Sequence, residues 1–176
     1  MLNAETIDNL AKEVHAINKA VGWWDNENDD TFTTKLQMAI TEVCESTEGE
    51  RKDMMDDHLP HRKMGEVELA DAAIRLLDLA VKYYWRFHDF LSYNPNIADD
   101  MDIASCHFFI IQDIVNIHIN ESKETIYYSQ ALCSIFKTGE MMGYDIMSAM
   151  REKIEYNKAR EDHKRHARAA KGGKKF

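Results

Sequence analysis

Apolar residues recur at intervals of three and four along most of this 176-residue chain, and residues that break helices are rare. Glycine occurs only seven times and proline twice. Intervals of three and four place side chains on one face of an α-helix, whereas strands alternate at every second residue. A sandwich or barrel of many short strands would also need more turn residues. The pattern therefore predicts an all-α fold, an antiparallel helical bundle.

The predicted helices are separated by polar stretches that contain most of the glycines and both prolines. They cover about 6–21, 31–51, 66–87, 101–119, 123–142 and 144–161. Gly22 stands where a left-handed residue is needed at the end of the first helix. We expect one domain over residues 1–163, followed by a basic, flexible tail over 164–176 that is too polar to pack by itself.

Charge is distributed unevenly along the chain. Residues 1–150 hold twelve Lys/Arg and twenty-seven Asp/Glu, whereas residues 151–176 hold ten and four. A protein that binds duplex nucleic acid needs a broad basic face, so this class is not expected. No apolar run approaches the roughly 18 residues of a membrane span, and the N-terminus lacks the pattern of a secretory signal. Three cysteines without paired spacing favour a reducing compartment, so we expect a cytoplasmic protein.

Two pairs of acidic residues lie within predicted helices, each pair three residues apart: Glu42 with Glu45, and Glu68 with Asp71. Three residues turn a helix by about 300°, so both carboxylates of a pair share one face. Each pair has apolar neighbours, and carboxylates close to a core are costly without partners. A solvated acidic face is the alternative for either pair alone. If the two helices pack antiparallel, the four carboxylates suit a hard cation such as Mg²⁺ or Mn²⁺.

Three stretches resemble the MazG-like nucleoside triphosphate pyrophosphohydrolases, an all-α family whose hallmark is EExxE followed by ExxD. Two of them are TEVCESTEGERK at 41–52 and VELADAAIRLLDLA at 67–80. The third, MREKIEYNKAR at 150–160 with the basic end KGGKKF, is similar to the family's C-terminal K-x-x-Y-N-x-x-R. With the first helix included, the resemblance covers about 1–87 and 139–176.

The chain departs from the family pattern in two places. Thr41 replaces the first Glu of EExxE, so only Glu42 and Glu45 match that motif. Residues 88–138 have no counterpart, which implies an inserted helical pair in a bundle of MazG-like type.

The resemblance implies Mg²⁺-dependent hydrolysis of a nucleoside or deoxynucleoside triphosphate to the monophosphate and pyrophosphate, with Mn²⁺ as the other fitting ion. It implies that Glu42, Glu45, Glu68 and Asp71 are the metal ligands and that the protein is a homodimer or homotetramer. Because no covalent nucleophile has a partnered base, direct attack by water is preferred. We assign Glu45 to orienting or deprotonating that water.

Cationic residues near the C-terminus are expected to bind the triphosphate. Lys153, Asn157 and Arg160 recur at i, i+4 and i+7, which is one face of the last predicted helix. Lys175 follows two glycines and is expected to close over the phosphates. The alternative for this segment is a solvated basic helix end that complements the helix dipole.

Five further residues complete the predicted site. Arg75 either pairs with the acidic site or contacts phosphate. Asp78 lies two turns beyond the second acidic pair on the same face, and we expect it to support the metal ligands. Trp23, Trp24 and Tyr156 either stack on the nucleobase or pack within the fold.

Two other functions stay open from the sequence. His88–Asp89, with His58 or His61 upstream, weakly matches the pattern of HD-type phosphohydrolases. A non-catalytic helical module that binds nucleotides or another protein is the second alternative, and Thr41 together with the unmatched segment favours it.

Overall fold

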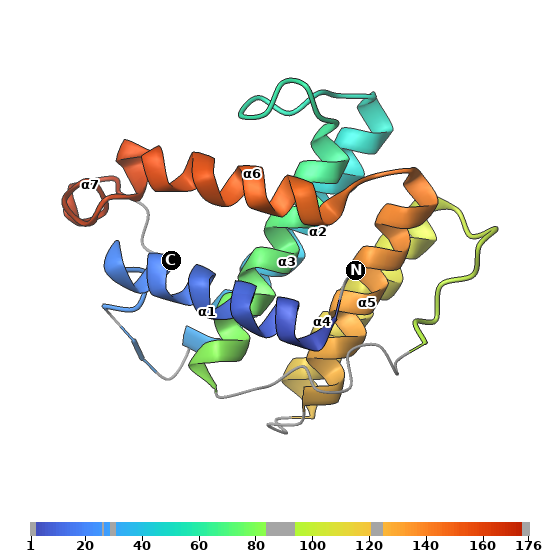
Figure 1. Ribbon diagram of the computed structural model, residues 1–176, viewed down its shortest axis with the longest axis horizontal. Helices are drawn as coiled ribbons and strands as arrows, with labels where there is room; N and C mark the ends of the chain where they lie inside the picture. Colours follow the sequence, from blue (N-terminus) through green and yellow to red (C-terminus); the bar gives the residue numbers. More distant parts are fainter. Residues whose placement is uncertain (1–2, 26, 29–30, 84–93, 121–124, 174–176) are drawn as a thin grey trace.

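The computed structural model describes residues 3–25, 27–28, 31–83, 94–120 and 125–173 (Figure 1). These residues form helices and no β-strand, apart from one isolated bridge between Met55 and Lys63. The all-α prediction is therefore confirmed. The α-helices are α1 (Ala4–Ala20), α2 (Thr31–Lys52), α3 (Met64–Lys82), α4 (Ile103–Ile119), α5 (Thr125–Met142), α6 (Ile146–Ala159) and α7 (Arg165–Ala169), with a short 3₁₀ helix, η2 (Glu161–His163), before the last.

The predicted helix bounds agree with the structure to within two residues at most ends. Gly22 follows α1 with a φ of +88°, which confirms the predicted left-handed residue there. The exception is α3, which was expected to reach Phe87 but ends at Lys82. Tyr83 caps the helix, and residues 84–87 of the predicted helix lie outside the described residues.

Helix α3 lies at the centre of the fold and contacts α1, α2, α5 and α6. Most of its residues are buried, from Gly65 to Ala80. In Figure 1, α2 runs behind α3, and α1 and α6 cross in front of it at a steep angle. The central hairpin of α2 and α3 is therefore covered on one side by the first and the last long helix.

The hairpin is tightest where α2 ends and α3 begins. A side chain at Gly49 would come within 2.9 Å of the Met64 side chain, so only glycine fits at this crossing. Ser46, one turn earlier, donates a hydrogen bond to the Gly65 carbonyl at 3.0 Å. These contacts set the antiparallel register of the two helices.

Helices α4 and α5 correspond to the helices predicted at 101–119 and 123–142, and α5 extends past residue 138, the expected end of the unmatched segment. They pack on each other, α4 packs on α2, and α5 packs on α3. The pair is attached to α2 by His107, which is buried and contacts the hydroxyls of Thr47 at 2.8 Å and Ser46 at 3.3 Å. Within the pair, buried Asp113 accepts hydrogen bonds from Ser134 and Gln130.

His107 predicts an acid-sensitive attachment of this pair. Burial lowers the pKa of His107 from 6.5 to about 4. Between these values the unfolded chain binds a proton that the folded chain excludes, so His107 makes stability fall as pH drops from about 6.5 towards 4. We expect His107→Asn, which keeps polar atoms but cannot titrate there, to flatten this part of the stability profile measured by urea unfolding. An unchanged acid slope in that variant would contradict the assignment.

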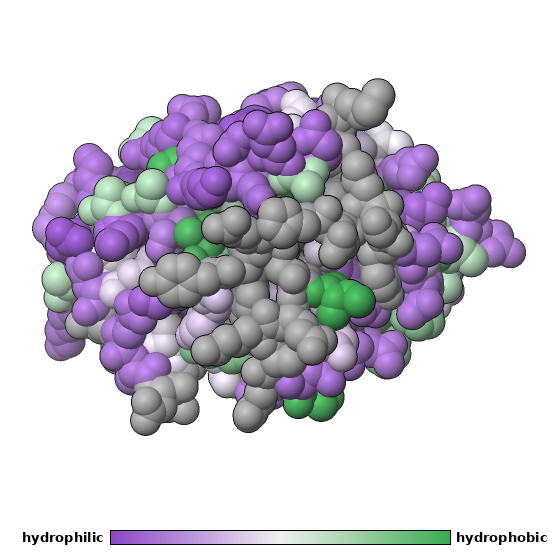
Figure 2. All heavy atoms as spheres, turned by 60° about the horizontal axis from the view of Figure 1, so that its bottom comes forward, coloured by the Kyte–Doolittle hydropathy of each residue, from purple (hydrophilic) through white to green (hydrophobic). Residues whose placement is uncertain are grey.

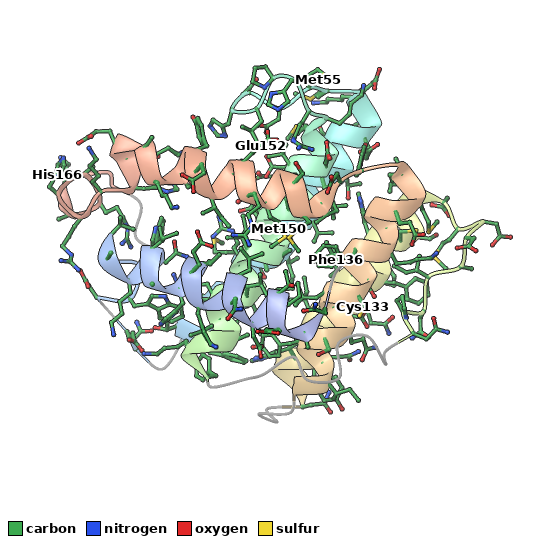
Figure 3. All side chains as sticks on the ribbon, in the orientation of Figure 1. Met55, Cys133, Phe136, Met150, Glu152 and His166 are labelled. Atoms are coloured by element: carbon green, nitrogen blue, oxygen red, sulfur yellow. The ribbon has the colours of Figure 1, made fainter. Side chains whose placement is uncertain are left out.

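An ion-pair network joins the connection between α2 and α3 to α6. Arg62 pairs with Glu66 at 2.6 Å and Glu152 at 2.7 Å, and donates to Ser148 at 2.7 Å. In Figure 3, Glu152 is labelled on α6 at the side facing this connection. The network fixes α6 against the start of α3 and so holds the C-terminal residues of α6 beside the central hairpin.

The described part of the C-terminal segment contacts the residues that follow α1. We expected a basic, flexible tail over residues 164–176, and in the structure α7 lies against Trp23 and Asp25. Arg168 lies over the ring of Trp23, 3.8 Å from its centroid, and Arg165 pairs with Asp25 at 2.6 Å. An aromatic face and a carboxylate supplied by that loop compensate for the polar composition of the tail. Lys175 lies outside the described residues.

The surface drawn in Figure 2 is mostly hydrophilic where residues are coloured, with separate hydrophobic patches. The large exposed apolar side chains include Phe108, Val115 and Ile119 on α4. Among the described helices, none has the length and apolar character required to cross a lipid bilayer.

Candidate metal centre

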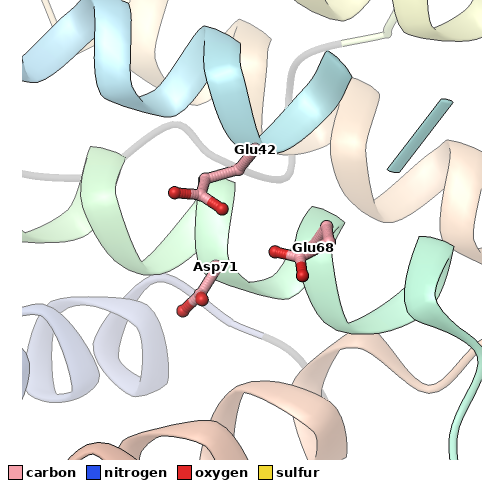
Figure 4. Close-up of side chains that lie close together, drawn as sticks. All are labelled: Glu42, Glu68 and Asp71. Atoms are coloured by element: carbon pink, nitrogen blue, oxygen red, sulfur yellow. The ribbon is translucent and has the colours of Figure 1, made fainter. Parts of the chain in front are cut away.

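Three of the four predicted carboxylates converge between α2 and α3. One oxygen from each of Glu42, Glu68 and Asp71 lies within 4.8 Å of the other two (Figure 4). Glu42 and Glu68 are each only 7% exposed, and the Asp71 side chain is 15% exposed. The spacing of three in α3 and the antiparallel register set at Ser46 bring these groups to one point.

Glu45, the fourth predicted ligand, is exposed and does not belong to this close group, although it lines the same cavity. It shares the face of Glu42 but lies one turn closer to the C-terminus of α2. The i, i+3 spacing of the sequence could not reveal this difference, because it depends on where α3 crosses α2.

Two cations lie against the three carboxylates. Arg75 pairs with Glu42 at 2.5 Å, so of its two predicted roles the structure contains the ion pair. Lys153 from α6 pairs with Asp71 at 3.1 Å and is only 2% exposed. When all three carboxylates are ionised, they carry one more negative charge than Arg75 and Lys153 neutralise.

The electrostatics of the cluster favour an additional cation. Burial, reinforced by Asp71, raises the pKa of Glu68 from 4.5 to about 9, and burial raises the pKa of Glu42 against the opposing charge of Arg75. Burial opposes the charge of Lys153, but Asp71 and Glu68 outweigh it and raise its pKa. Carboxylates that are protonated for lack of counter-charge release those protons when a cation binds.

The cluster lies in the wall of a cavity of about 410 Å³, a size typical of small-molecule sites, which span roughly 300–1,000 Å³. Most of the predicted site residues line this cavity. They are Trp23, Trp24, Glu42, Glu45, Glu68, Asp71, Arg75, Asp78, Lys153, Asn157 and Arg160. Tyr156 is not among the lining residues.

One end of the cavity is formed by α6 and the connection between α2 and α3. Lys153, Asn157 and Arg160 line it together, as their common helix face predicted. Arg160 forms a two-point ion pair with Asp162, at 2.7 and 3.0 Å. Tyr156 packs on His58, with ring centroids 4.7 Å apart, so its ring supports the wall of the site.

Two buried polar atoms of this cavity have no hydrogen-bond partner among the described residues: Nε of Arg75 and Oδ1 of Asn157. Buried polar atoms are nearly always satisfied in folded proteins. Both residues line the cavity, so a polar group bound there could satisfy these two atoms.

The other end of the cavity is aromatic and depends on Asp78. This carboxylate accepts hydrogen bonds from His15 at 2.7 Å, Asn18 at 2.7 Å and the Trp24 indole at 3.0 Å. Asp78 therefore fixes α1 and the loop that follows it. The three hydrogen-bond donors belong to these segments, whereas we expected Asp78 to support the metal ligands. Trp24 is buried, so of its two predicted roles it has the one of packing within the fold. Trp23 is partly exposed.

Sequence reasoning missed several cavity residues. Lys35 lies seven residues before Glu42, so their shared helix face was available as evidence. The cavity is also lined by Asn18 of α1, His58 of the connection between α2 and α3, and His163 of η2. No helix spacing in the sequence connects these residues with Glu42 or Asp71. Thr41, which replaces a family Glu, lines the cavity while its hydroxyl donates to the Gln37 carbonyl at 3.0 Å.

No protein family model matches the chain, and neither a curated protein nor a solved structure matches it. The family resemblance therefore depends on the motifs themselves and on where their residues lie. Of those motif residues, Glu42, Glu68, Asp71, Lys153, Asn157 and Arg160 meet in one cavity. His88 and Asp89, the basis of the HD-type alternative, lie outside the described residues.

Proposed function

We propose that the protein is a MazG-like nucleoside triphosphate pyrophosphohydrolase that needs Mg²⁺, or Mn²⁺ in its place. The observation that carries this proposal is the convergence of Glu42, Glu68 and Asp71 in a cavity that is also lined by basic and by aromatic side chains. A triphosphate and a nucleobase require these two kinds of surface within reach of one metal centre.

The residues present fit a divalent cation. Carboxylate oxygens are the ligands that Mg²⁺ and Mn²⁺ prefer, and the three carboxylates, once ionised, carry one more charge than Arg75 and Lys153 neutralise. Glu42, Glu68 and Asp71 would hold the ion, and Glu45, exposed on the cavity wall, is the remaining candidate ligand. When bound, the cation supplies Lewis acidity to the phosphates and to an attacking water.

The chain's own side chains account for the other requirements of the reaction. Lys153 and Arg160 provide positive charge for the phosphates, and Asn157 and Arg75 offer buried polar atoms that a ligand would satisfy. Glu45 is the carboxylate with the most freedom to accept a proton from water, because it is exposed and outside the close group.

The proposal is tested with a panel of ribonucleoside and deoxyribonucleoside triphosphates in the presence of Mg²⁺. We expect equimolar pyrophosphate and nucleoside monophosphate, with turnover removed by EDTA and restored by Mg²⁺ or Mn²⁺. Release of inorganic phosphate or free nucleoside would favour an HD-type activity instead. Nucleotide binding without any turnover would favour the non-catalytic module.

We also propose that the protein forms a homodimer or homotetramer. Phe108, Val115 and Ile119 expose apolar surface along α4, which is compatible with subunit contact. Sedimentation equilibrium gives the mass of the assembly directly, and a monomer at micromolar concentration would contradict this part of the proposal.

A further inference from the structure

The aromatic end of the cavity lies a defined distance from the carboxylate cluster. Lys35 precedes Glu42 by seven residues on α2, and Asp78 follows Asp71 by seven residues on α3. Because α2 and α3 are antiparallel, both residues lie at one level, about 10 Å along the helices from the cluster. A ribose and a base together can span such a distance, so this level corresponds to the far edge of a nucleobase whose phosphates lie at the cluster.

Lys35 is a cation in this cavity without a carboxylate partner among the described residues. Asp78 is the carboxylate whose charge acts on it most strongly, but both Asp78 oxygens already accept hydrogen bonds from His15, Asn18 and Trp24. Burial lowers the pKa of Lys35 from 10.5 to about 8, against the opposing pull of Asp78. Lys35 lines the cavity, and its half-buried ammonium keeps N–H donors that a ligand in the cavity could use.

The surroundings of Lys35 hold its ammonium in place. Its Nζ lies 5.1 Å from the ring centroid of Trp23 and 5.0 Å from that of Trp24, and it donates to the Trp23 carbonyl at 3.3 Å. These contacts use ring faces and one oxygen, so they orient the group without exhausting its hydrogen-bonding capacity.

We propose that Lys35 is a specificity-determining residue that donates a hydrogen bond to a keto oxygen at the far edge of the nucleobase. The inference rests on the proposed function. Uracil, thymine and guanine carry an oxygen at this edge, whereas cytosine and adenine carry an amino group. An ammonium has hydrogen-bond donors and no acceptor. It can therefore donate to the keto oxygen, but it cannot form a hydrogen bond with the amino group, which is also a donor.

The test compares UTP, GTP, CTP and ATP as substrates of the wild-type protein and of Lys35→Met, which keeps the length and apolar packing of the side chain. We expect wild-type kcat/KM to favour UTP and GTP. In Lys35→Met, kcat/KM for UTP and GTP should fall by about 10–100-fold, the value of a hydrogen bond to a charged group, with CTP and ATP little changed. Lys35→Arg, which keeps a donor, should retain part of the preference.

The matched control is Lys82→Met. Lys82 also lies over the Trp24 ring, at 5.3 Å, but it pairs with Glu27 at 2.6 Å and does not line the cavity. We expect this variant to keep the wild-type order of substrates. A fall in Lys35→Met that is equal for all four nucleotides, or no fall for any, would overturn the inference.

Equilibrium binding of the same four nucleotides, measured by calorimetry, separates this inference from the proposed function. If the wild type binds keto bases more tightly through Lys35 but releases no pyrophosphate, the catalytic proposal fails and the inference stands. If pyrophosphate is released without a preference that depends on Lys35, the inference fails alone. If no nucleotide binds, both fail.

Discussion

Replacing Glu68 with glutamine should reduce kcat/KM for the best nucleotide by at least about 100-fold, because even groups that only orient metal ligands contribute 10–100-fold. Glu68 is one of three carboxylates that converge within 4.8 Å, and the amide that replaces it has neither the charge nor the affinity of a carboxylate for a hard cation. We expect the same result from Asp71→Asn. Turnover of each variant is measured at saturating Mg²⁺.

The same substitution should leave the metal-free protein no less stable. Burial beside other carboxylates disfavours the charged form of Glu68, so an uncharged side chain of equal shape resembles the form that the metal-free cluster favours. Wild-type protein should gain thermal stability when Mg²⁺ is added, and Glu68→Gln should lose most of this gain.

The control for both measurements is Asp113→Asn on α4. Asp113 is a buried carboxylate with a raised pKa, caused mainly by burial, but it lies outside the cavity and accepts from Ser134 and Gln130. We expect wild-type turnover and a wild-type response to Mg²⁺ from this variant. Activity that survives Glu68→Gln, or an equal loss in Asp113→Asn, would count against a metal centre at the cluster.

Replacing Lys153 with methionine should destabilise the metal-free protein by about 3 kcal/mol or more, the usual cost of leaving one partner of a buried ion pair uncompensated. Lys153 is almost fully buried and lies 3.1 Å from Asp71, so it acts as an internal counter-ion of the cluster. Without it, the carboxylates must take up protons or attract another cation.

Added Mg²⁺ should therefore restore more stability to Lys153→Met than it adds to the wild type, because the ion replaces the missing charge. Urea unfolding with and without Mg²⁺ measures both effects. The double variant Lys153→Met/Asp71→Asn should recover part of the lost stability, since it removes the carboxylate left unpaired.

Lys158→Met is the matched control on the same helix. Lys158 is partly exposed and pairs with Glu155 at 2.5 Å, and surface ion pairs of this kind contribute less than about 1 kcal/mol. A Lys153→Met protein as stable as Lys158→Met, with the same response to Mg²⁺, would show that Lys153 does not compensate the cluster.

The contacts of Trp23 and Trp24 could not be predicted from local sequence patterns. The sequence left open whether Trp23 and Trp24 meet a base or the core, and the structure separates them. Trp24 is buried because its indole donates to Asp78, which lies 54 positions away in the sequence. Trp23 carries Arg168 on its ring, a contact between segments about 145 positions apart. Contacts between residues so far apart in the chain produce no periodic pattern in the sequence.

The sequence by itself determined the helices, most of their ends, and the faces that carry the acidic and basic residues. It did so because helix periodicity and helix-ending residues such as Gly22 act over a few positions. Together with the family resemblance, these local rules nominated Glu42, Glu45, Glu68 and Asp71, and three of the four converge in the structure.

Only the tertiary structure decided that Glu45 lies outside the close group, that Arg75 and Lys153 compensate the other carboxylates, and that Lys35 shares their cavity. The physical reason is that a helix face fixes the direction of a side chain but not what lies opposite. That partner is set by the depth and register at which two helices pack, and close contacts such as Gly49 against Met64 determine them.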